Sequence, residues 1–388
     1  MSVQAQLSVP ISGTDTVIHP ETEFEQIIDG STAVNNLIKA TKLFIPVPKD
    51  YYYRPSLFTS NKTSITIPAG TGVVVNDTYF EVTNDTVVSF TSALPASSRK
   101  GRDVYVYACV SNNALTFVMS MESTYPSGYT ADTSRKIGGF HCLCADVGTI
   151  SGHTLSGYIA GDILPASRWD LKFRAASGNE GMVFCEGINK WVDIYLSSVS
   201  GNKLVSVNGG TTADGASATA FSWMKFNLWL SRSKKHMPRQ DEFMEFSLGS
   251  NQGTNVQGSS DKSTTGGYVD TAGVRMISNI GCEDCCGFLW QWGLDTGDSR
   301  RDNTSEDNSN LTDFAQVCAK TDSYKSATDT TETANSYGQH YRDPARVLLG
   351  GYWNRGVCCG SRASSWDGGS LCLYSFNGCR GLSFPASV

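Results

Sequence analysis

The stretch that decides the fold is LLGGYWNRGVCCGSRASSWDGGSLCLYSFNGCRGL, residues 348–382 near the C-terminus. It combines glycine pairs, two tryptophans and an Arg-Gly step with interspersed Tyr, Phe, Ser and Cys. Glycines permit tight turns with unusual backbone angles, and tryptophans supply large apolar volumes. We therefore expect little regular secondary structure here, with Trp353 and Trp366 contributing to a rigid core.

Two helices are predicted upstream of this stretch, where the apolar spacing changes to that of a helix. The first covers Ala218 to Leu230 and is expected to be mostly buried, with Phe221, Met224 and Leu228 on one side. The second opens at Met237, carries Pro238 in its first turn and ends near Gly249. Its predicted buried residues are Phe243, Phe246 and Leu248. Two shorter strands around Trp191, within Met182 to Leu196, precede these helices.

Strand and turn patterns dominate residues 45–164. Runs such as Thr63–Ile67, Asp103–Val110 and Leu115–Met121 alternate with period two, and the last two are expected to pair. The predicted domains are a leader at 1–44, an all-β sandwich-like spacer at 45–164 and an α+β domain at 165–388. The leader contains one stretch with helical spacing, Glu21–Ala40. A polar run at about 295–345 is predicted to be a surface insertion.

Composition excludes several classes of protein. Hydrophobic residues make up 40% of 388, enough for buried cores, and the net charge of -6 disfavours nucleic-acid binding. No apolar run approaches the ~20 residues of a bilayer span, so no membrane insertion is expected. The N-terminus lacks the pattern of a secretory signal. The 12 cysteines are expected to be mostly thiols in a reducing cytoplasm.

The C-terminal half resembles a known family, the phage major tropism determinants and related target proteins of diversity-generating retroelements. The resemblance rests on the helix pair, on Gly287 followed by Trp290 and Trp292, and on the anchors of residues 348–382. It covers about 165–388 and implies a C-type-lectin-like fold of the sulfatase-modifying-factor type. The anchors, taken as scaffold, are Trp290, Trp292, Gly350, Gly351, Trp353, Asn354, Gly360, Arg362, Trp366, Gly378, Arg380 and Gly381.

The same resemblance implies that certain codons of residues 348–382 are randomised by adenine-directed mutagenesis. It places the variable, receptor-binding positions at Tyr352, Arg355, Cys358, Ser365, Asp367, Gly368, Cys372, Tyr374, Phe376 and Asn377. Randomising the first two bases of an Asn codon cannot produce Lys, Glu, Gln, Met or Trp, and none of these residues occupies the ten positions. Tyr and Phe supply contact area at modest entropic cost, while Ser, Gly and Asn adapt polar contacts.

The function implied by the resemblance is that of a receptor-binding protein at the tip of a phage tail fibre. The expected partners are a bacterial surface receptor, protein or glycan, and other tail-fibre proteins, and the expected assembly is a homotrimer. Several weak sites on one trimer gain affinity by avidity. No catalytic residue, cofactor or metal is predicted.

Alternatives remain at this point. A variable protein on a bacterial surface has the same fold but is expected to carry an export signal, and a glycan-acting enzyme needs a pair of carboxylates in a cleft. Cys282, Cys285 and Cys286 have a CxxC spacing that suggests zinc, although a structural site usually has four ligands, and small buried thiols are the alternative. The acidic residues after Asp295 lack the spacing of a calcium loop.

Overall fold

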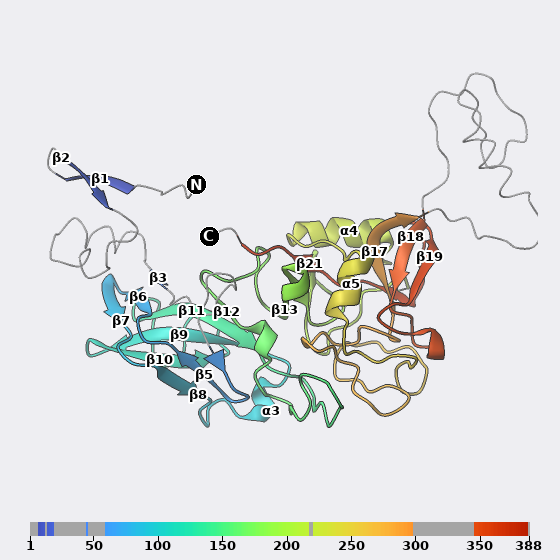
Figure 1. Ribbon diagram of the computed structural model, residues 1–388, viewed down its shortest axis with the longest axis horizontal. Helices are drawn as coiled ribbons and strands as arrows, with labels where there is room; N and C mark the ends of the chain where they lie inside the picture. The colour runs from blue at the N-terminus through green and yellow to red at the C-terminus, as the bar shows by residue number, and fades with distance from the viewer. Residues whose placement is uncertain are drawn as a thin grey trace, which may run out of the picture. The chain divides into compact units, whose positions relative to one another are not determined.

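The computed structural model describes residues 7–11, 14–18, 44–45, 59–216, 220–297 and 345–386 (Figure 1). Most of the predicted leader, including the stretch Glu21–Ala40, lies outside these residues, as does the insertion at 298–344. The chain divides into two compact units. The first comprises Met1–Ala93, Val104–Gly139 and Trp169–Phe173, and the second Leu94–Asp103, Phe140–Arg168 and Arg174–Val388. Residues 140–164 thus group with the second unit, and the domain boundary at 164/165 stays a prediction.

The first unit is built from short antiparallel strands. Its sheets have the orders β1-β2, β3-β6-β7, β4-β5-β8 and β10-β9-β11-β12. The bounds are β1 Leu7–Ile11, β2 Thr14–Ile18, β3 Phe44–Ile45, β4 Thr59–Ser60, β5 Ser64–Ile67, β6 Gly72–Val75, β7 Thr78–Glu81, β8 Thr86–Ser89, β9 Asp103–Ser111, β10 Ala114–Ser120, β11 Ser134–His141 and β12 Trp169–Asp170.

The two longest hairpin strands of this unit confirm the predicted pairing, although β9 is buried on both faces. β9 and β10 form an antiparallel hairpin in the register Tyr107↔Val118, with Asn112 and Asn113 at positive φ in its turn. Two asparagines at positive φ give the turn the twist that matches the strands. Tyr105 packs edge-on against Trp169 of β12 at 6.5 Å between ring centroids. Apolar contacts across neighbouring strands therefore stabilise the longest hairpin of this unit.

The second unit is α+β with much irregular backbone. Its elements are α3 Ala96–Arg99, η1 Pro165–Ser167, β13 Met182–Cys185, η2 Glu186–Ile188, β14 Lys190–Asp193, β15 Ser198–Ser200, β16 Lys203–Val205, α4 Trp223–Arg232, α5 Gln240–Phe246, β17 Trp290–Gly297, β18 Ala345–Leu349, η3 Gly356–Cys358, β19 Ser364–Gly368, β20 Asn377–Gly378 and β21 Leu382–Ser383. The predicted strand pair around Trp191 is confirmed as β13 and β14, and β21 adds a third strand.

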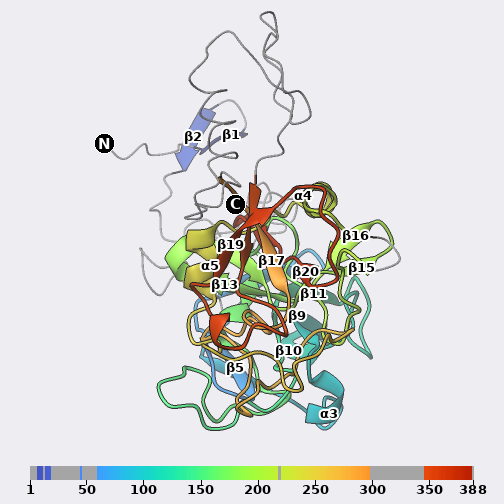
Figure 2. The same cartoon turned by 90° about the vertical axis from the view of Figure 1, so that its right-hand side faces the viewer.

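One four-stranded sheet carries the C-terminal segment. Its order is β19-β18-β17-β20, and β20 runs parallel to β17 while the other pairs are antiparallel. α4 and α5 lie beside this sheet (Figure 2). β17 continues through Gly297, so residues 295–297, predicted as the start of the insertion, belong to a strand instead. Asp295 there accepts a hydrogen bond from the Gln240 backbone N–H at 2.6 Å.

Both predicted helices exist, but they begin and end at other residues than predicted, and some side chains predicted to be buried are exposed. α4 begins at Trp223 because the Ser222 side chain caps it, accepting from the Lys225 N–H. Its buried residues are Trp223, Phe226 and Leu230, whereas Met224 and Leu228 are 55% and 51% exposed. α5 buries Phe243 and Phe246, but Leu248 lies beyond its end and is half exposed. The predictions for Met224, Leu228 and Leu248 were wrong because neighbours distant in sequence select the buried face. No helix among the described residues is long and apolar enough to cross a membrane.

Candidate functional site

Two consecutive glycines turn the chain out of the central strand β18. Gly350 and Gly351 have φ angles of 89° and 84°, which side chains other than glycine rarely adopt. A Cβ at Gly350 would lie 2.5 Å from the Cys285 carbonyl oxygen. The Gly-Gly pair is therefore required both by backbone angle and by close packing.

Backbone hydrogen bonds fix the segment that follows. The Trp353 N–H donates to the Phe288 carbonyl at 2.9 Å, and the Trp290 N–H donates to the Phe376 carbonyl at 2.9 Å. The Tyr374 carbonyl accepts from the Gly215 N–H at 3.1 Å. These bonds use main-chain atoms only, so they persist whichever side chains occupy the segment.

A buried arginine ties the end of the segment to the core. Arg380 is fully buried and donates to the carbonyl oxygens of Asp193 and Ile194 at 2.6 and 2.5 Å, and also to that of Glu283. Its Nε donates to Gln291 Oε1 at 3.2 Å. One guanidinium thus joins β14, β17 and the turn that contains Glu283, as its fork of donors permits.

Three of the predicted variable residues form one stack of rings, which we call the aromatic ladder: Tyr352, Phe376 and Tyr374. The Tyr352 and Phe376 centroids lie 4.8 Å apart with planes at 25°, and those of Phe376 and Tyr374 lie 4.9 Å apart at 9°. The Arg355 guanidinium lies 5.2 Å from the Tyr352 ring centroid. Tyr374 is 48% exposed, so the ladder reaches the surface at this end. The structure therefore brings together four predicted residues that are up to 24 positions apart.

The other six predicted variable positions differ in their exposure to solvent. Cys358 is exposed, while Ser365 and Cys372 are partly exposed. Gly368 is buried, and a Cβ added there would lie 2.7 Å from the Trp292 ring, while Asn377 has no exposed surface. A buried side chain cannot touch a receptor, so the structure does not support contact roles for Gly368 and Asn377. Asp367 lies in β19, and its side chain is outside the described part of the chain.

The predicted scaffold residues also separate into two groups. Trp290, Trp292 and Arg380 are buried, and Trp353 and Trp366 are partly buried. Gly360, Gly378 and Gly381 are buried at close approaches of 2.5, 2.9 and 2.6 Å between an added Cβ and a neighbouring atom. By contrast, Asn354 and Arg362 are exposed, so neither can support the core from within.

Sequence reasoning missed the loop that holds this segment from outside it. The buried Asn255 donates to the Trp353 carbonyl at 2.5 Å and accepts from the Gly356 N–H at 3.0 Å. Gln252 accepts from the Ser361 N–H at 3.2 Å. Nothing in the Gly, Ser and Thr stretch around these residues indicates this role, because both contacts span about a hundred positions. The sequence also did not indicate that three apolar side chains of residues 348–382, the segment that carries the aromatic ladder, are exposed: Val357 at 87%, Leu371 at 70% and Leu373 at 51%.

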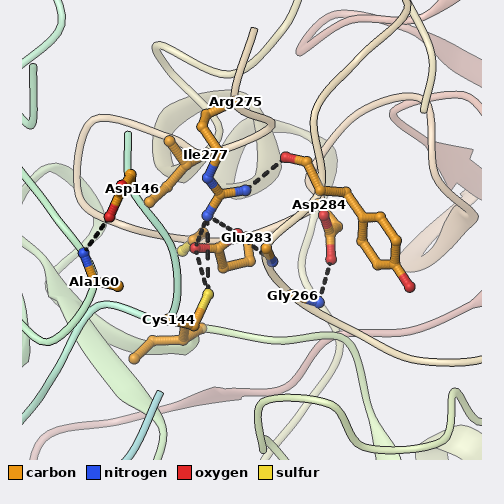
Figure 3. Close-up of polar contacts among 12 residues, drawn as sticks. Cys144, Asp146, Ala160, Gly266, Arg275, Ile277, Glu283 and Asp284 are labelled. Carbon is orange, nitrogen blue, oxygen red and sulfur yellow. Dashed lines mark hydrogen bonds and ion pairs between the residues drawn. The ribbon is translucent and has the colours of Figure 1, made fainter. Parts of the chain in front are cut away.

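A buried polar cluster lies in the same unit (Figure 3). Arg275 donates to both carboxylate oxygens of Glu283 at 2.7 and 2.8 Å, and the Cys144 thiol donates to Glu283 Oε1 at 3.3 Å. Burial raises the pKa of Cys144 well above its ordinary value, so this sulfur is a neutral thiol. Among the described residues no group of His, Cys, Asp or Glu could hold a metal ion, and Cys282, Cys285 and Cys286 are buried thiols.

The fold and the site together define an α+β domain that displays an irregular, backbone-anchored surface segment. Its family is shown by comparison with known proteins. The family described as "Mtd second domain" matches residues 55–170. A tail fiber receptor-binding protein of Bordetella phage BPP-1 is 30% identical over 349 residues, which cover 84% of this chain and 80% of that protein.

Solved structures agree with this assignment. The Major Tropism Determinant M1 variant superposes with a TM-score of 0.67 and 26% identity, over 91% of this chain and 88% of that one. The I1 variant has the same TM-score and identity over 93% and 91%. The chain belongs to the major tropism determinant family, and its C-terminal unit accordingly has a C-type-lectin-like fold.

Proposed function

We propose that this chain is the receptor-binding protein at the tip of a phage tail fibre, where it determines which host cells the phage recognises. Its family membership supports this role, since the relative from Bordetella phage BPP-1 is a tail fiber receptor-binding protein. The partners are then a receptor on a bacterial surface and other tail-fibre proteins, and the location is the virion. The protein acts by binding, without chemistry.

The observation that carries the proposal is the aromatic ladder on a backbone held by main-chain bonds. Phe376 and Tyr374 form their hydrogen bonds to the scaffold through their carbonyl oxygens, while the rings of Tyr352 and Phe376 also pack against the core. Replacing their side chains therefore leaves the anchoring bonds in place. Such a surface tolerates substitution and offers a large rigid contact area, the two properties that a variable binding site needs.

Diversification by a retroelement belongs to the same proposal. The ladder residues, Arg355, Cys358, Ser365 and Cys372 are the exposed or partly exposed members of the predicted variable set. The genomic test is a near-copy of the coding sequence for residues 348–382, with adenines at the ten variable codons, beside a reverse transcriptase gene. Absence of such a copy from the phage genome overturns diversification and leaves receptor binding standing.

Receptor binding is tested with the purified, fluorescently labelled protein on a panel of bacterial strains. On a strain that binds, Tyr352→Ser and Tyr374→Ser should each weaken binding at least ten-fold, which corresponds to about 1.4 kcal/mol. Val87→Ser is the control, because Val87 is 63% exposed in the first unit, outside the site. Equal loss in the control variant, or no loss in the ladder variants, contradicts the proposed binding surface.

A homotrimer is part of the proposal, because three copies add avidity to a weak single site. Light scattering coupled to size exclusion measures the mass of the assembly against the 41.9 kDa of one chain. A mass of one or two chains at micromolar concentration overturns the trimer.

A further inference from the structure

A groove in the second unit lies between helix α5, the second half of strand β17 and Trp366 of β19 (Figure 2). Its volume is about 670 Å³, within the roughly 300–1,000 Å³ of small-ligand sites. Trp366, Leu294 and Met244 line it with apolar surface, and each of these side chains is partly exposed. None of the described residues that line the groove belongs to the ten predicted variable positions. The groove is therefore a surface distinct from the aromatic ladder.

The Trp366 ring is held in place by the protein itself. It packs against the core cluster that contains Phe243, and a Cβ added at Gly297 would lie 2.5 Å from its Cε3 atom. The indole N–H donates to the Ser364 hydroxyl at 3.2 Å. Because side chains alternate along a strand, Ser364 and Trp366 share one face of β19, and the predicted variable Ser365 lies on the other. A fixed aromatic ring thus forms one wall of the groove.

Three charged side chains form the polar rim of the groove. The Arg239 Nε atom lies 3.4 Å from Asp241 Oδ1 and 3.8 Å from Asp295 Oδ1. Asp295 also accepts the Gln240 N–H through Oδ2 at 2.6 Å, which fixes this carboxylate. The side chains of Arg239 and Asp241 are 61% and 76% exposed, so their remaining hydrogen-bonding capacity faces solvent. One guanidinium and two carboxylates leave one formal negative charge on the rim.

An aromatic wall beside charged hydrogen-bonding groups selects the class of ligand. The C–H groups on one face of a sugar ring pack against an aromatic ring. Sugar hydroxyls both donate and accept, so they bond to carboxylates and to a guanidinium alike. A phosphate or a uronic acid is disfavoured by the net negative charge of the rim. An apolar ligand is disfavoured because it would remove water from the three charged groups without replacing its hydrogen bonds.

We propose that this groove binds a neutral sugar unit of a bacterial surface glycan. The biological role of the site rests on the proposed receptor-binding function and adds a constant component to it, because variants that differ only at the ten variable positions keep the groove. One shallow site binds weakly, but three copies on one trimer bind a repetitive glycan with avidity. The groove then serves the first attachment to the cell, and the aromatic ladder selects the receptor.

Saturation-transfer NMR on the purified full-length protein tests the groove. The probes are the methyl glycosides of glucose, galactose, mannose and N-acetylglucosamine, with that of glucuronic acid as an anionic comparison. At least one neutral glycoside should receive saturation at about 10 mM, a concentration that occupies a weak site with a Kd of about 1 mM. The glucuronide should receive less. If no neutral glycoside receives saturation, or if the glucuronide binds more tightly than every neutral probe, the inference fails.

Substitutions locate the bound sugar on the protein. Asp241→Ala should weaken binding of the neutral glycoside at least about five-fold, because a hydrogen bond to a charged group is lost. Glu245→Ala is the matched control, since it removes another exposed carboxylate from α5, and Glu245 does not line the groove. Trp366→Phe, which keeps an aromatic ring of smaller area, should also weaken binding. Equal binding by the Asp241→Ala and Glu245→Ala variants contradicts the assignment.

A variant of the aromatic ladder separates this site from the proposed receptor-binding surface. Tyr374→Ser should leave sugar binding unchanged, because Tyr374 does not line the groove. Loss of the sugar signal in this variant would place the sugar on the ladder and overturn the groove. No cell is present in these measurements, so their failure leaves receptor binding by the ladder standing. Conversely, a failure of the ladder variants on bacterial cells leaves the sugar result standing.

Discussion

Arg380→Met is the perturbation that most directly separates the scaffold from the displayed surface. The substitution removes the donors to the three carbonyl oxygens of Asp193, Ile194 and Glu283. A buried acceptor that loses its partner costs about 1–3 kcal/mol. The sum is offset in part because methionine, unlike arginine, carries no charge into the core. We therefore expect a loss of about 3–5 kcal/mol in the free energy of unfolding.

The matched perturbation on the surface is Tyr374→Ser. Its ring stacks on Phe376 and is half exposed, so the lost stacking amounts to about 0.5–1.5 kcal/mol, while the anchoring bond to its carbonyl remains. Urea denaturation followed by circular dichroism measures both variants. In a thermal scan, the arginine variant should melt roughly 10 °C lower and the tyrosine variant within about 4 °C of the unaltered protein.

Comparable losses in the two variants would refute the reasoning, because the ladder would then belong to the folding core. A small loss in Arg380→Met would equally show that its hydrogen bonds do not hold the segment.

Asn255→Ala provides an intermediate case. The substitution removes the amide that donates to the Trp353 carbonyl and the amide oxygen that accepts from the Gly356 N–H. Hydrogen exchange should therefore accelerate in residues 353–356 more than in β18.

The remaining predictions concern charge, pH and backbone. Glu283→Gln should lower the free energy of unfolding by about 3 kcal/mol, because it leaves Arg275 buried without its anion; a loss below about 1 kcal/mol in urea denaturation contradicts this. His236 is neutral in the fold, since burial lowers its pKa below the ordinary 6.5, and its ring nitrogens contact the Leu382 carbonyl oxygen and the Lys190 ammonium. The unfolded chain therefore binds the extra proton. The contribution of His236 to the free energy of unfolding is fully present above about pH 6.5 and is lost as the pH decreases toward the folded pKa. His236→Gln should reduce this dependence of the free energy of unfolding on pH, measured by urea unfolding at several pH values. Gly351→Ala should destabilise the protein by more than about 1 kcal/mol, because an added Cβ meets the Cys359 sulfur at 2.7 Å and φ is positive; an unchanged melting temperature would show that the turn relaxes.

The sequence alone was sufficient where the determinants are local. Period-two alternation predicted β9 and β10 and their pairing, and helical spacing predicted α4 and α5 with ends that differ by up to five residues. The glycine pair before Tyr352 predicted a tight turn, because only glycine adopts those angles without strain. In each case the residues that decide the structure are neighbours in the chain.

Only the tertiary structure decided which side chains share a surface or a core. It joined Tyr352 to Phe376 in one stack, exposed Met224 and Leu228, and buried Asn377. It also placed Arg380 against the carbonyl oxygen of Glu283, a hydrogen bond across 97 positions between groups that are both buried. Local patterns specify the angles of the backbone, whereas burial and charge balance depend on partners that the fold brings from elsewhere in the chain.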